Sequence, residues 1–225
     1  MKQIFSRRKS YPLSFSLVIA LTAFSGGAQE KDRSKEGQPP PAPAAARVDE
    51  PSTQAKEVLA WGNDMAKEIS QAIEGWLGSG AVTQERLFAY LYYPIADTDP
   101  TKYTTDYDTL ADRDFQPIID KYVAKSNLLI FALATDRNGY APTHNRQFSQ
   151  PLTGNRAVDL VNNRTKRMFG DQIGFRAARN QKPYLIQAYA RDTGEIVADL
   201  SIPILIRGRH WGCVRIGYRQ VDRQQ

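Results

Sequence analysis

Three segments near the end of the chain alternate apolar and polar residues, and this alternation restricts the fold more than any other feature. They span residues 183–192, 195–208 and 210–219, and the turn sequences at 193–194 and 208–209 separate them. Successive side chains of a β-strand point to opposite faces of the sheet. The pattern therefore predicts three antiparallel strands with one apolar and one mixed face.

Two further strands are predicted before these three. Residues 128–136, LLIFALATD, have the composition of a buried strand, and the turn residues 137–139 lead into YAPTHN at 140–145. The stretch DRNGYAPTHN is first of all a hairpin, because Asn138 and Gly139 tolerate positive φ.

Helices are predicted where apolar residues recur every three to four positions. The longest covers residues 54–77 after a Ser52 or Thr53 cap. Shorter helices are expected at 83–93, 115–126 and 157–169, with a polar loop between the first two. The order of elements predicts an α+β domain over residues 53–222, a five-stranded antiparallel sheet with the long N-terminal helix packed on its apolar face.

The N-terminus has the pattern of an export signal. Basic residues precede an apolar run from Leu13 to Phe24, and small residues follow up to Ala28. Residues 1–28 are therefore expected to be a cleaved signal peptide, which places the mature protein in the periplasm or outside the cell; a retained membrane anchor is the alternative. Residues 29–52 are charged and proline-rich, which predicts a disordered linker.

Export also changes the charge balance. The chain has 30 Lys and Arg against 24 Asp and Glu, and the leader carries four of the basic residues. The mature chain would retain 26 basic residues, a net charge of about +2. A nucleic acid partner is therefore not expected.

The two faces of the predicted sheet differ in character. One face carries apolar residues that the long helix could cover. The other mixes polar, aromatic and charged groups, among them Gln187, Tyr189, Arg191, Asp199, Ser201, Trp211, Cys213 and Arg215. This face is either a solvated surface with cross-strand ion pairs or the floor of a small-molecule pocket.

Basic and imidazole groups are the other candidates for a site. In NRTKR, a helix would put Asn163, Lys166 and Arg167 on one face and Arg164 on its flank. These cations could form a solvated surface or a clamp for a carboxylate or phosphate. His144 could serve the structure or donate to an anionic ligand from the hairpin.

Catalytic and metal motifs are missing from the sequence. There is no HxxxH, CxxC or GxSxG motif, and Cys213 is the only cysteine. No cofactor or metal is expected, and catalysis is the least favoured interpretation.

A series of motifs resembles a known sensor domain. DRNGYAPTHN, FSQPLTG, NRTKR, AARN, DTGE and GRHWG follow one another between about residues 80 and 220. Together they resemble the PAS-like or single Cache-type sensor domain of bacterial methyl-accepting chemotaxis proteins. The resemblance implies a ligand-binding domain of a helix and an antiparallel sheet. Those receptors continue into transmembrane and signalling helices, whereas only seven residues follow Tyr218 here, so we expect an exported copy that captures a ligand or contacts a membrane receptor.

These observations predict a non-enzymatic sensory domain for a small anionic or zwitterionic molecule. The predicted ligand-binding residues are Tyr140, Thr143, His144, Arg164, Arg167, Gln187, Tyr189, Asp199, Ser201, Trp211 and Arg215. The alternative is a protein-interaction module without a pocket. It would use the aromatic residues 90–93, or form a homodimer through the helix 54–77 stripe that includes Trp61 and Trp76.

Overall fold

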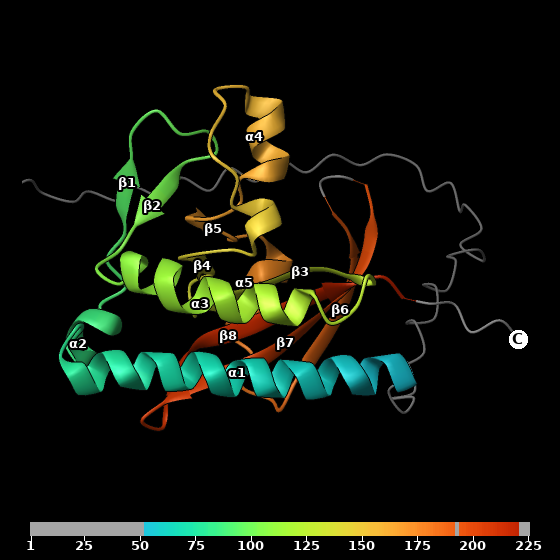
Figure 1. Cartoon of the computed structure of the whole chain (residues 1–225), viewed down its shortest axis with the longest axis horizontal. Helices are drawn as coiled ribbons and strands as arrows, with labels where there is room; N and C mark the ends of the chain where they lie inside the picture. Colours follow the sequence, from blue (N-terminus) through green and yellow to red (C-terminus); the bar gives the residue numbers. More distant parts are fainter. Residues whose placement is uncertain (1–51, 192–193, 221–225) are drawn as a thin grey trace, which may run out of the picture. The chain divides into compact units, whose positions relative to one another are not determined.

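A four-stranded antiparallel sheet, sheet B, forms the centre of the domain (Figure 1). Its strands run in the order β3-β8-β7-β6, with β3 at Leu129–Asp136, β6 at Leu185–Ala190, β7 at Ile196–Ile206 and β8 at Arg209–Tyr218. The β7–β8 hairpin turns through Arg207 and Gly208, both with positive φ. The three C-terminal strands are confirmed.

The computed structural model describes residues 52–191 and 194–220. These residues belong to one unit, Val48–Gln225. The predicted signal peptide and all of the predicted linker except Ser52 lie outside the described residues, as does part of the turn at 193–194. Among the described helices, none combines the length and apolar character needed to cross a bilayer.

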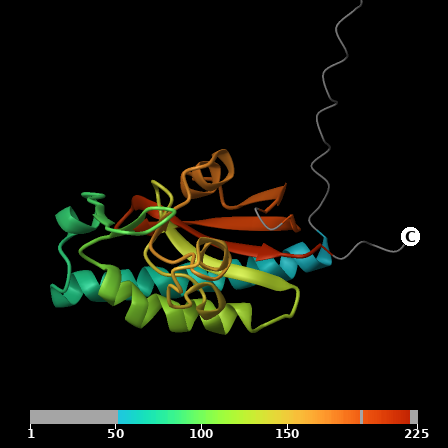
Figure 2. The same ribbon diagram turned by 90° about the horizontal axis from the view of Figure 1, so that it is seen from above.

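Helix α1, Thr53–Ser79, covers one face of sheet B (Figures 1 and 2). Ser52 caps its first turn by accepting from the Ala55 N–H, and Gly80 ends it at φ 73°. Its buried stripe packs on the apolar face of β7 and β8. The contact is close at Gly62, where an added Cβ would lie 3.0 Å from Leu200. The prediction that the long helix covers the apolar face is confirmed.

Helix α3, Asp108–Val123, lies beside α1 and also packs against β3. Phe115 of α3 stacks on Trp76 of α1 with ring centroids 4.8 Å apart. The Trp76 indole N–H donates to Asp114 at 2.6 Å. Trp76 is only 2% exposed, so the stripe proposed for self-pairing is occupied by sheet B and α3. Trp76 is thus part of the core of one copy, and a homodimer through the rest of α1 stays a prediction.

A second sheet, sheet A, replaces the expected single five-stranded sheet. Its short antiparallel strands run β1-β2-β5-β4, with β1 at Tyr93–Ile95, β2 at Lys102–Thr104, β4 at Tyr140–Ala141 and β5 at Arg167–Met168. Strands of two or three residues are too short to show a period in the sequence, and their pairing depends on residues far apart in the chain. The α+β class with antiparallel pairing is confirmed, whereas the five-strand count is wrong.

All four of the shorter helices differ from the prediction, and α3 begins at Asp108, within the predicted polar loop, instead of at residue 115. Helix α2 covers only Gln84–Leu87, and α4 covers Arg156–Asn162 rather than 157–169. Helix α5, Gln172–Ala178, was not predicted, and it contacts β7 and β8. A 3₁₀ turn, η1, covers Arg146–Phe148. The early end of α4 matters most, because it places the predicted basic cluster in a turn that leads into β5.

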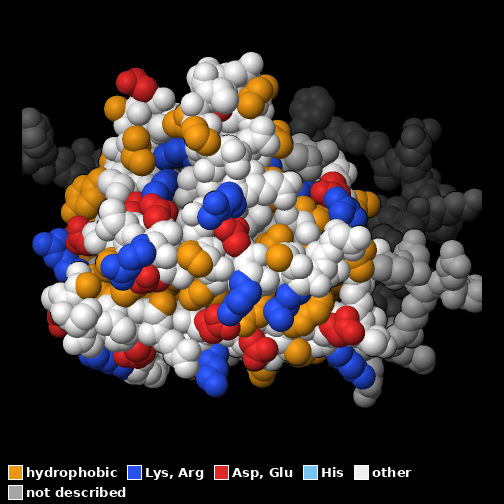
Figure 3. Space-filling model, in the orientation of Figure 1, with side chains coloured by type: hydrophobic (Ala, Val, Ile, Leu, Met, Phe, Trp, Pro, Cys, Tyr) orange, Lys and Arg blue, Asp and Glu red, His pale blue; other side chains and the backbone are white. Residues whose placement is uncertain are grey.

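Charges of both signs are interspersed on the face shown in Figure 3. Lys121 of α3 pairs with Glu68 of α1, and Lys166 pairs with Asp112 at 2.7 Å. This face carries no broad basic patch of the kind that binds nucleic acid.

Candidate functional site: an arginine-lined cavity

A cavity of about 280 Å³ lies where the mixed face of sheet B meets the chain segment 164–173. One wall comes from β3, β6 and β8, and the other from the segment that contains β5 and leads into α5. The lining residues are Phe131, Leu133, His144, Arg164, Arg167, Phe169, Asp171, Ile173, Tyr189, Ala190, Arg191 and Arg215. The mixed face is thus the floor of a cavity rather than an open surface.

Four arginines and a single carboxylate, that of Asp171, line this cavity. Aromatic rings lie against the guanidinium groups. The centroid distances are 5.7 Å for Arg164 and Phe148, 5.7 Å for Arg167 and Phe169, 5.2 Å for Arg191 and Phe148, and 5.8 Å for Arg215 and Phe169. Other contacts orient three of these groups: Arg164 Nε donates to the Val161 carbonyl at 3.2 Å, Arg167 Nη1 donates to the Leu160 carbonyl at 3.3 Å, and Arg191 pairs with Glu195 at 3.3 Å.

Arg215 is anchored in the floor by Asp199. Its Nε lies 3.0 Å from Asp199 Oδ2, and Nη2 also donates to this carboxylate. The two side chains are 4% and 0% exposed. Burial alone would lower the pKa of Arg215, but the Asp199 carboxylate raises it overall, so the guanidinium stays charged.

Tyr189 adds a neutral donor to the same corner of the cavity. Its hydroxyl donates to Asp199 Oδ2 at 3.3 Å and lies 3.4 Å from Arg215 Nη2. Burial, assisted by the Asp199 charge, raises the pKa of Tyr189 well above its usual range. The phenol therefore remains protonated at neutral pH.

His144 is buried in the cavity wall at 2% exposure. Its Nδ1 lies 2.9 Å from the Asn145 backbone nitrogen and 2.6 Å from Asn145 Oδ1. Burial lowers the pKa of His144 to about 3, and Arg164, Arg191 and Arg215 act in the same direction. The ring is a neutral hydrogen-bonding group at physiological pH.

Phe169 forms the centre of the second wall, and the DRNG turn determines its position. The Phe169 N–H donates to the Gly139 carbonyl at 2.8 Å. A Cβ on Gly139 would lie 2.4 Å from the Phe169 oxygen, and Gly139 has φ +85°. Glycine is thus needed here for a close approach as well as for its backbone conformation. The DRNG turn thus supports the cavity by holding the backbone of Phe169.

Five of the eleven predicted ligand-binding residues line the cavity. They are His144, Arg164, Arg167, Tyr189 and Arg215. Arg191 was recognised on the mixed face but not chosen, although it follows Tyr189 by two positions on one strand face. Phe131 and Phe169 were missed, because an apolar residue in a pocket wall looks the same in sequence as one in the core.

Trp211 lies on the other side of sheet B. Its ring packs edge-on against Tyr107 and Phe115, each at 6.2 Å, within the core under α1 and α3. The register of β7 and β8 shifts between Ile204 and Leu205, opposite Trp211. A bulge of this kind inserts one residue and reverses the alternation beyond it, so the predicted face of Trp211 is wrong.

The remaining predicted residues lie behind the cavity lining. Tyr140 donates to Asp108 at 2.9 Å, and Thr143 is 1% exposed. Gln187 Nε2 donates to the Ile173 carbonyl at 3.0 Å and so attaches α5 to β6. Ser201 and Asp199 are fully buried in β7. Their expected contact with a ligand would have to be indirect.

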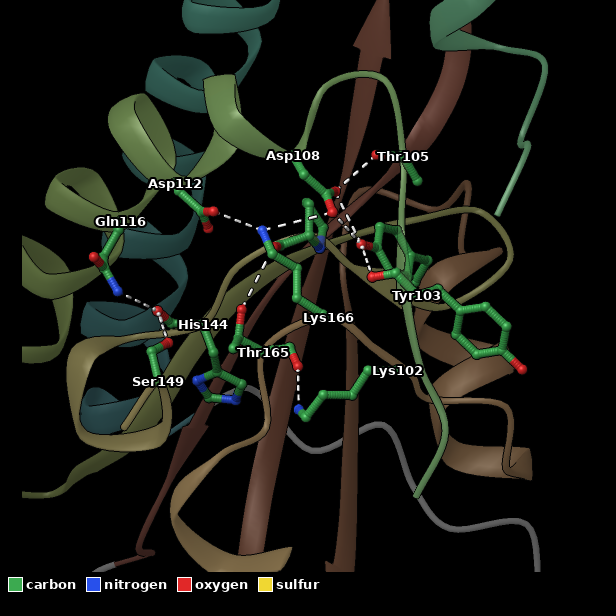
Figure 4. A network of polar contacts seen from close by, with 12 residues as sticks. Lys102, Tyr103, Thr105, Asp108, Asp112, Gln116, His144, Ser149, Thr165 and Lys166 are labelled. Atoms are coloured by element: carbon green, nitrogen blue, oxygen red, sulfur yellow. Dashed lines mark hydrogen bonds and ion pairs between the residues drawn. The ribbon is translucent and has the colours of Figure 1, made fainter. Parts of the chain in front are cut away.

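The predicted helical basic cluster is also rearranged. Helix α4 ends at Asn162, and Lys166 has φ +59°, so Lys166 and Arg167 do not share a helix face. Lys166 Nζ donates to the Pro142 carbonyl at 2.6 Å and to Asp112 at 2.7 Å (Figure 4). Arg164 and Arg167 remain together at the cavity.

Cysteine and metal chemistry find no support at this site. Burial raises the pKa of the Cys213 thiol to about 12, and Thr135 Oγ1 lies 3.5 Å from its sulfur. A protonated, buried thiol is not a nucleophile. Within residues 52–191 and 194–220, no three His, Cys, Asp or Glu side chains form a group that could hold a metal ion.

Comparison with known proteins gives only distant likenesses. No protein-family model matches the chain, and no curated protein matches it. The solved structures similar to this chain include two at 14% identity and a TM-score of 0.35. One is an extracellular ligand binding receptor from Desulfohalobium retbaense DSM5692, with 75% of this chain and 25% of that chain covered. The other is the sensory domain of a Campylobacter jejuni chemoreceptor with isoleucine bound, with 72% and 60% covered.

The chain thus spans a quarter and three fifths of those two proteins. A TM-score of 0.35 is too low to assign a function, so the site has to be interpreted from its own residues.

Proposed function

We propose that the domain binds a small anionic molecule in the arginine-lined cavity, as an exported sensor-type domain without catalytic activity. The observation that carries the proposal is the set of four arginines, each close to an aromatic ring, around one cavity with a single carboxylate in its lining. Guanidinium groups bind carboxylates and phosphates through paired N–H donors.

The size and walls of the cavity limit the ligand class. A volume of about 280 Å³ is near the lower end of the usual range for small-molecule sites, roughly 300–1,000 Å³, and suits a metabolite rather than a polymer. Phe131, Leu133 and Ile173 provide an apolar wall for a short hydrocarbon part. Asp171 is the lining group that could accept the ammonium of a zwitterion.

The location and signalling partner are part of the proposal. The leader-like residues 1–28 support export, and a membrane receptor remains a proposed partner. The chemistry of the lining supports binding rather than turnover, because its ionised groups are mainly arginines, its imidazole is neutral and the nearby thiol is protonated.

The test is a binding measurement with acetate, succinate, inorganic phosphate and single amino acids. A ligand that binds only the folded state raises stability by RT ln(1 + [L]/Kd), about 2.7 kcal/mol at a hundredfold excess over Kd. Arg167→Gln should weaken binding by about tenfold or more, the loss of one charged hydrogen bond. Arg86→Gln, an exposed arginine on α2, is the control with the same change in charge. Equal affinity of both variants would contradict the assignment.

A second candidate is a protein-interaction role for residues 90–93. Leu91 and Tyr93 are 49% and 48% exposed; Tyr93 is the first residue of the edge strand β1, and Leu91 precedes that strand. An exposed edge strand with apolar residues can pair with another chain. Sedimentation over a wide concentration range, compared with Leu91→Ser and Tyr93→Ser variants, decides whether the domain self-associates there.

A further inference from the structure

The segment that presents Arg164 and Arg167 to the cavity is held from behind by a buried lysine. Lys102, at the start of β2, donates from Nζ to the Thr165 carbonyl at 2.6 Å (Figure 4). The same Nζ donates to the Asn163 carbonyl at 3.2 Å. Lys102 is only 5% exposed. A lysine is rarely buried to this extent unless its ammonium has a defined partner.

These contacts fall on the two carbonyls that bracket Arg164. Backbone hydrogen bonds hold the same stretch at two other positions. The Arg164 N–H donates to the Phe148 carbonyl at 2.6 Å, and the Tyr103 N–H donates to the Lys166 carbonyl at 2.9 Å. Arg167 pairs with Lys102 across β2 and β5. The Lys102 ammonium is the side-chain group that ties this non-helical backbone between α4 and β5 to sheet A.

We propose that Lys102 is a positioning residue of the anion site: by binding the Asn163 and Thr165 carbonyls it fixes the backbone from which Arg164 and Arg167 reach the cavity, and it adds positive charge behind them. The inference rests on the proposed function and deepens it, because it adds a residue that does not line the cavity. Nothing in the local sequence, PTKYT, distinguishes this lysine from a solvated one.

The surroundings of Lys102 make its effect depend on pH. Burial and the charge of Arg167 lower the pKa of Lys102 to about 8; Lys166 acts in the same direction, and Asp159 opposes them. At pH 7 the ammonium is charged, and at pH 9 it is largely a neutral amine. A neutral amine donates weaker hydrogen bonds and no longer attracts an anion. Anion affinity should therefore fall as the pH rises through about 8.

The experiment combines hydrogen exchange with anion binding on the mature chain. Lys102→Met removes the ammonium and keeps the side-chain length, Lys102→Arg keeps a permanent charge, and Lys121→Met removes an exposed lysine on α3 as the control. Amide exchange is followed at residues 164–168 at pH 7. Affinity is measured at pH 7 and pH 9 with the anion among acetate, succinate and inorganic phosphate that binds the wild type.

The expected result is faster exchange at residues 164–168 in Lys102→Met and about tenfold weaker binding, with neither change in Lys121→Met. Wild-type affinity should decline from pH 7 to pH 9, and Lys102→Arg should restore binding and remove the decline. Unchanged exchange in Lys102→Met, or equal wild-type affinity at the two pH values, would overturn the inference.

The experiment distinguishes failure of the proposed anion binding from failure of the Lys102 inference. If neither these three anions nor single amino acids bind the wild type, the anion site is refuted. Exchange at residues 164–168 then still decides whether Lys102 holds this segment: faster exchange supports the anchoring role and unchanged exchange overturns it. If Lys102→Met does not fold, the wild-type pH comparison and Lys102→Arg decide the inference.

Discussion

The Arg215 guanidinium and the Asp199 carboxylate form a fully buried ion pair in the floor of the cavity, with Nε 3.0 Å from Oδ2. The pair joins β7 to β8, where Arg215 lies opposite Ser201. Asp199 occupies one edge of the guanidinium and leaves the group charged beside the cavity. One carboxylate therefore both orients Arg215 and maintains its charge.

Removal of one partner of this pair should be strongly destabilising. A buried charge without its counterion costs about 3–5 kcal/mol, so Asp199→Asn and Arg215→Met should each lower the free energy of unfolding by about that amount. The double variant leaves no unpaired buried charge. Its loss in the free energy of unfolding should therefore be smaller than the sum of the losses in the two single variants. Urea unfolding of the four proteins measures this coupling, and strictly additive losses would contradict it.

Stability should fall in mild acid because of His144. Its pKa is about 3 in the folded protein and about 6.5 when unfolded. The contribution of His144 to the free energy of unfolding is therefore complete above pH 6.5. It is lost as the pH falls toward 3, because in this range the imidazole takes up a proton in the unfolded state but not in the folded state. The slope is about 1.4 kcal/mol per pH unit.

The control is His144→Gln, which should be less stable at pH 7 but show a flatter decline between pH 6 and pH 4.5. Chemical unfolding at several pH values gives the difference between the two proteins. Parallel curves would show that His144 does not titrate as its burial requires.

Gly139→Ala should cost more stability than an equivalent change at another positive-φ glycine. Both Gly139 and Gly208 have positive φ, which costs an alanine about 1–2 kcal/mol. A Cβ at Gly208 meets nothing within 4 Å, whereas at Gly139 it would lie 2.4 Å from the Phe169 oxygen. We expect a loss of about 1–2 kcal/mol for Gly208→Ala and at least about twice that for Gly139→Ala.

The same pair of variants tests the support of the cavity. Gly139→Ala should also weaken anion binding because Phe169 must move, and Gly208→Ala should not. Thermal unfolding and a binding titration on both variants check the two expectations. Equal losses of stability would show that the turn yields without displacing Phe169.

Trp76→Ala should test whether the α1 stripe belongs to the core. Trp76 stacks on Phe115 and is bonded to Asp114, so truncation should cost about 3–5 kcal/mol. The unfolding midpoint should be independent of protein concentration in the wild type. A midpoint that rises with concentration, together with a small loss in Trp76→Ala, would return the stripe to a dimer interface.

The sequence predicted the elements whose patterns are local and long. The 27-residue helix α1 and strands β6, β7 and β8 follow from apolar periods of 3.6 and 2 that extend over many residues. Arg164, Arg167 and His144 were found because their residue types bind anions wherever the backbone places them. Residue type and period were sufficient for these predictions.

Tertiary structure decided the features that depend on distant contacts. The bulge opposite Ile204 and Leu205 moved Trp211 into the core, and the pairing of β2 with β5 brought Lys102 behind Arg164. Neither event leaves a local pattern, because a register shift and a short strand each gain their free energy from partners elsewhere in the chain. The sequence thus determined which groups could bind an anion, and the packing of two sheets decided which of them face one cavity.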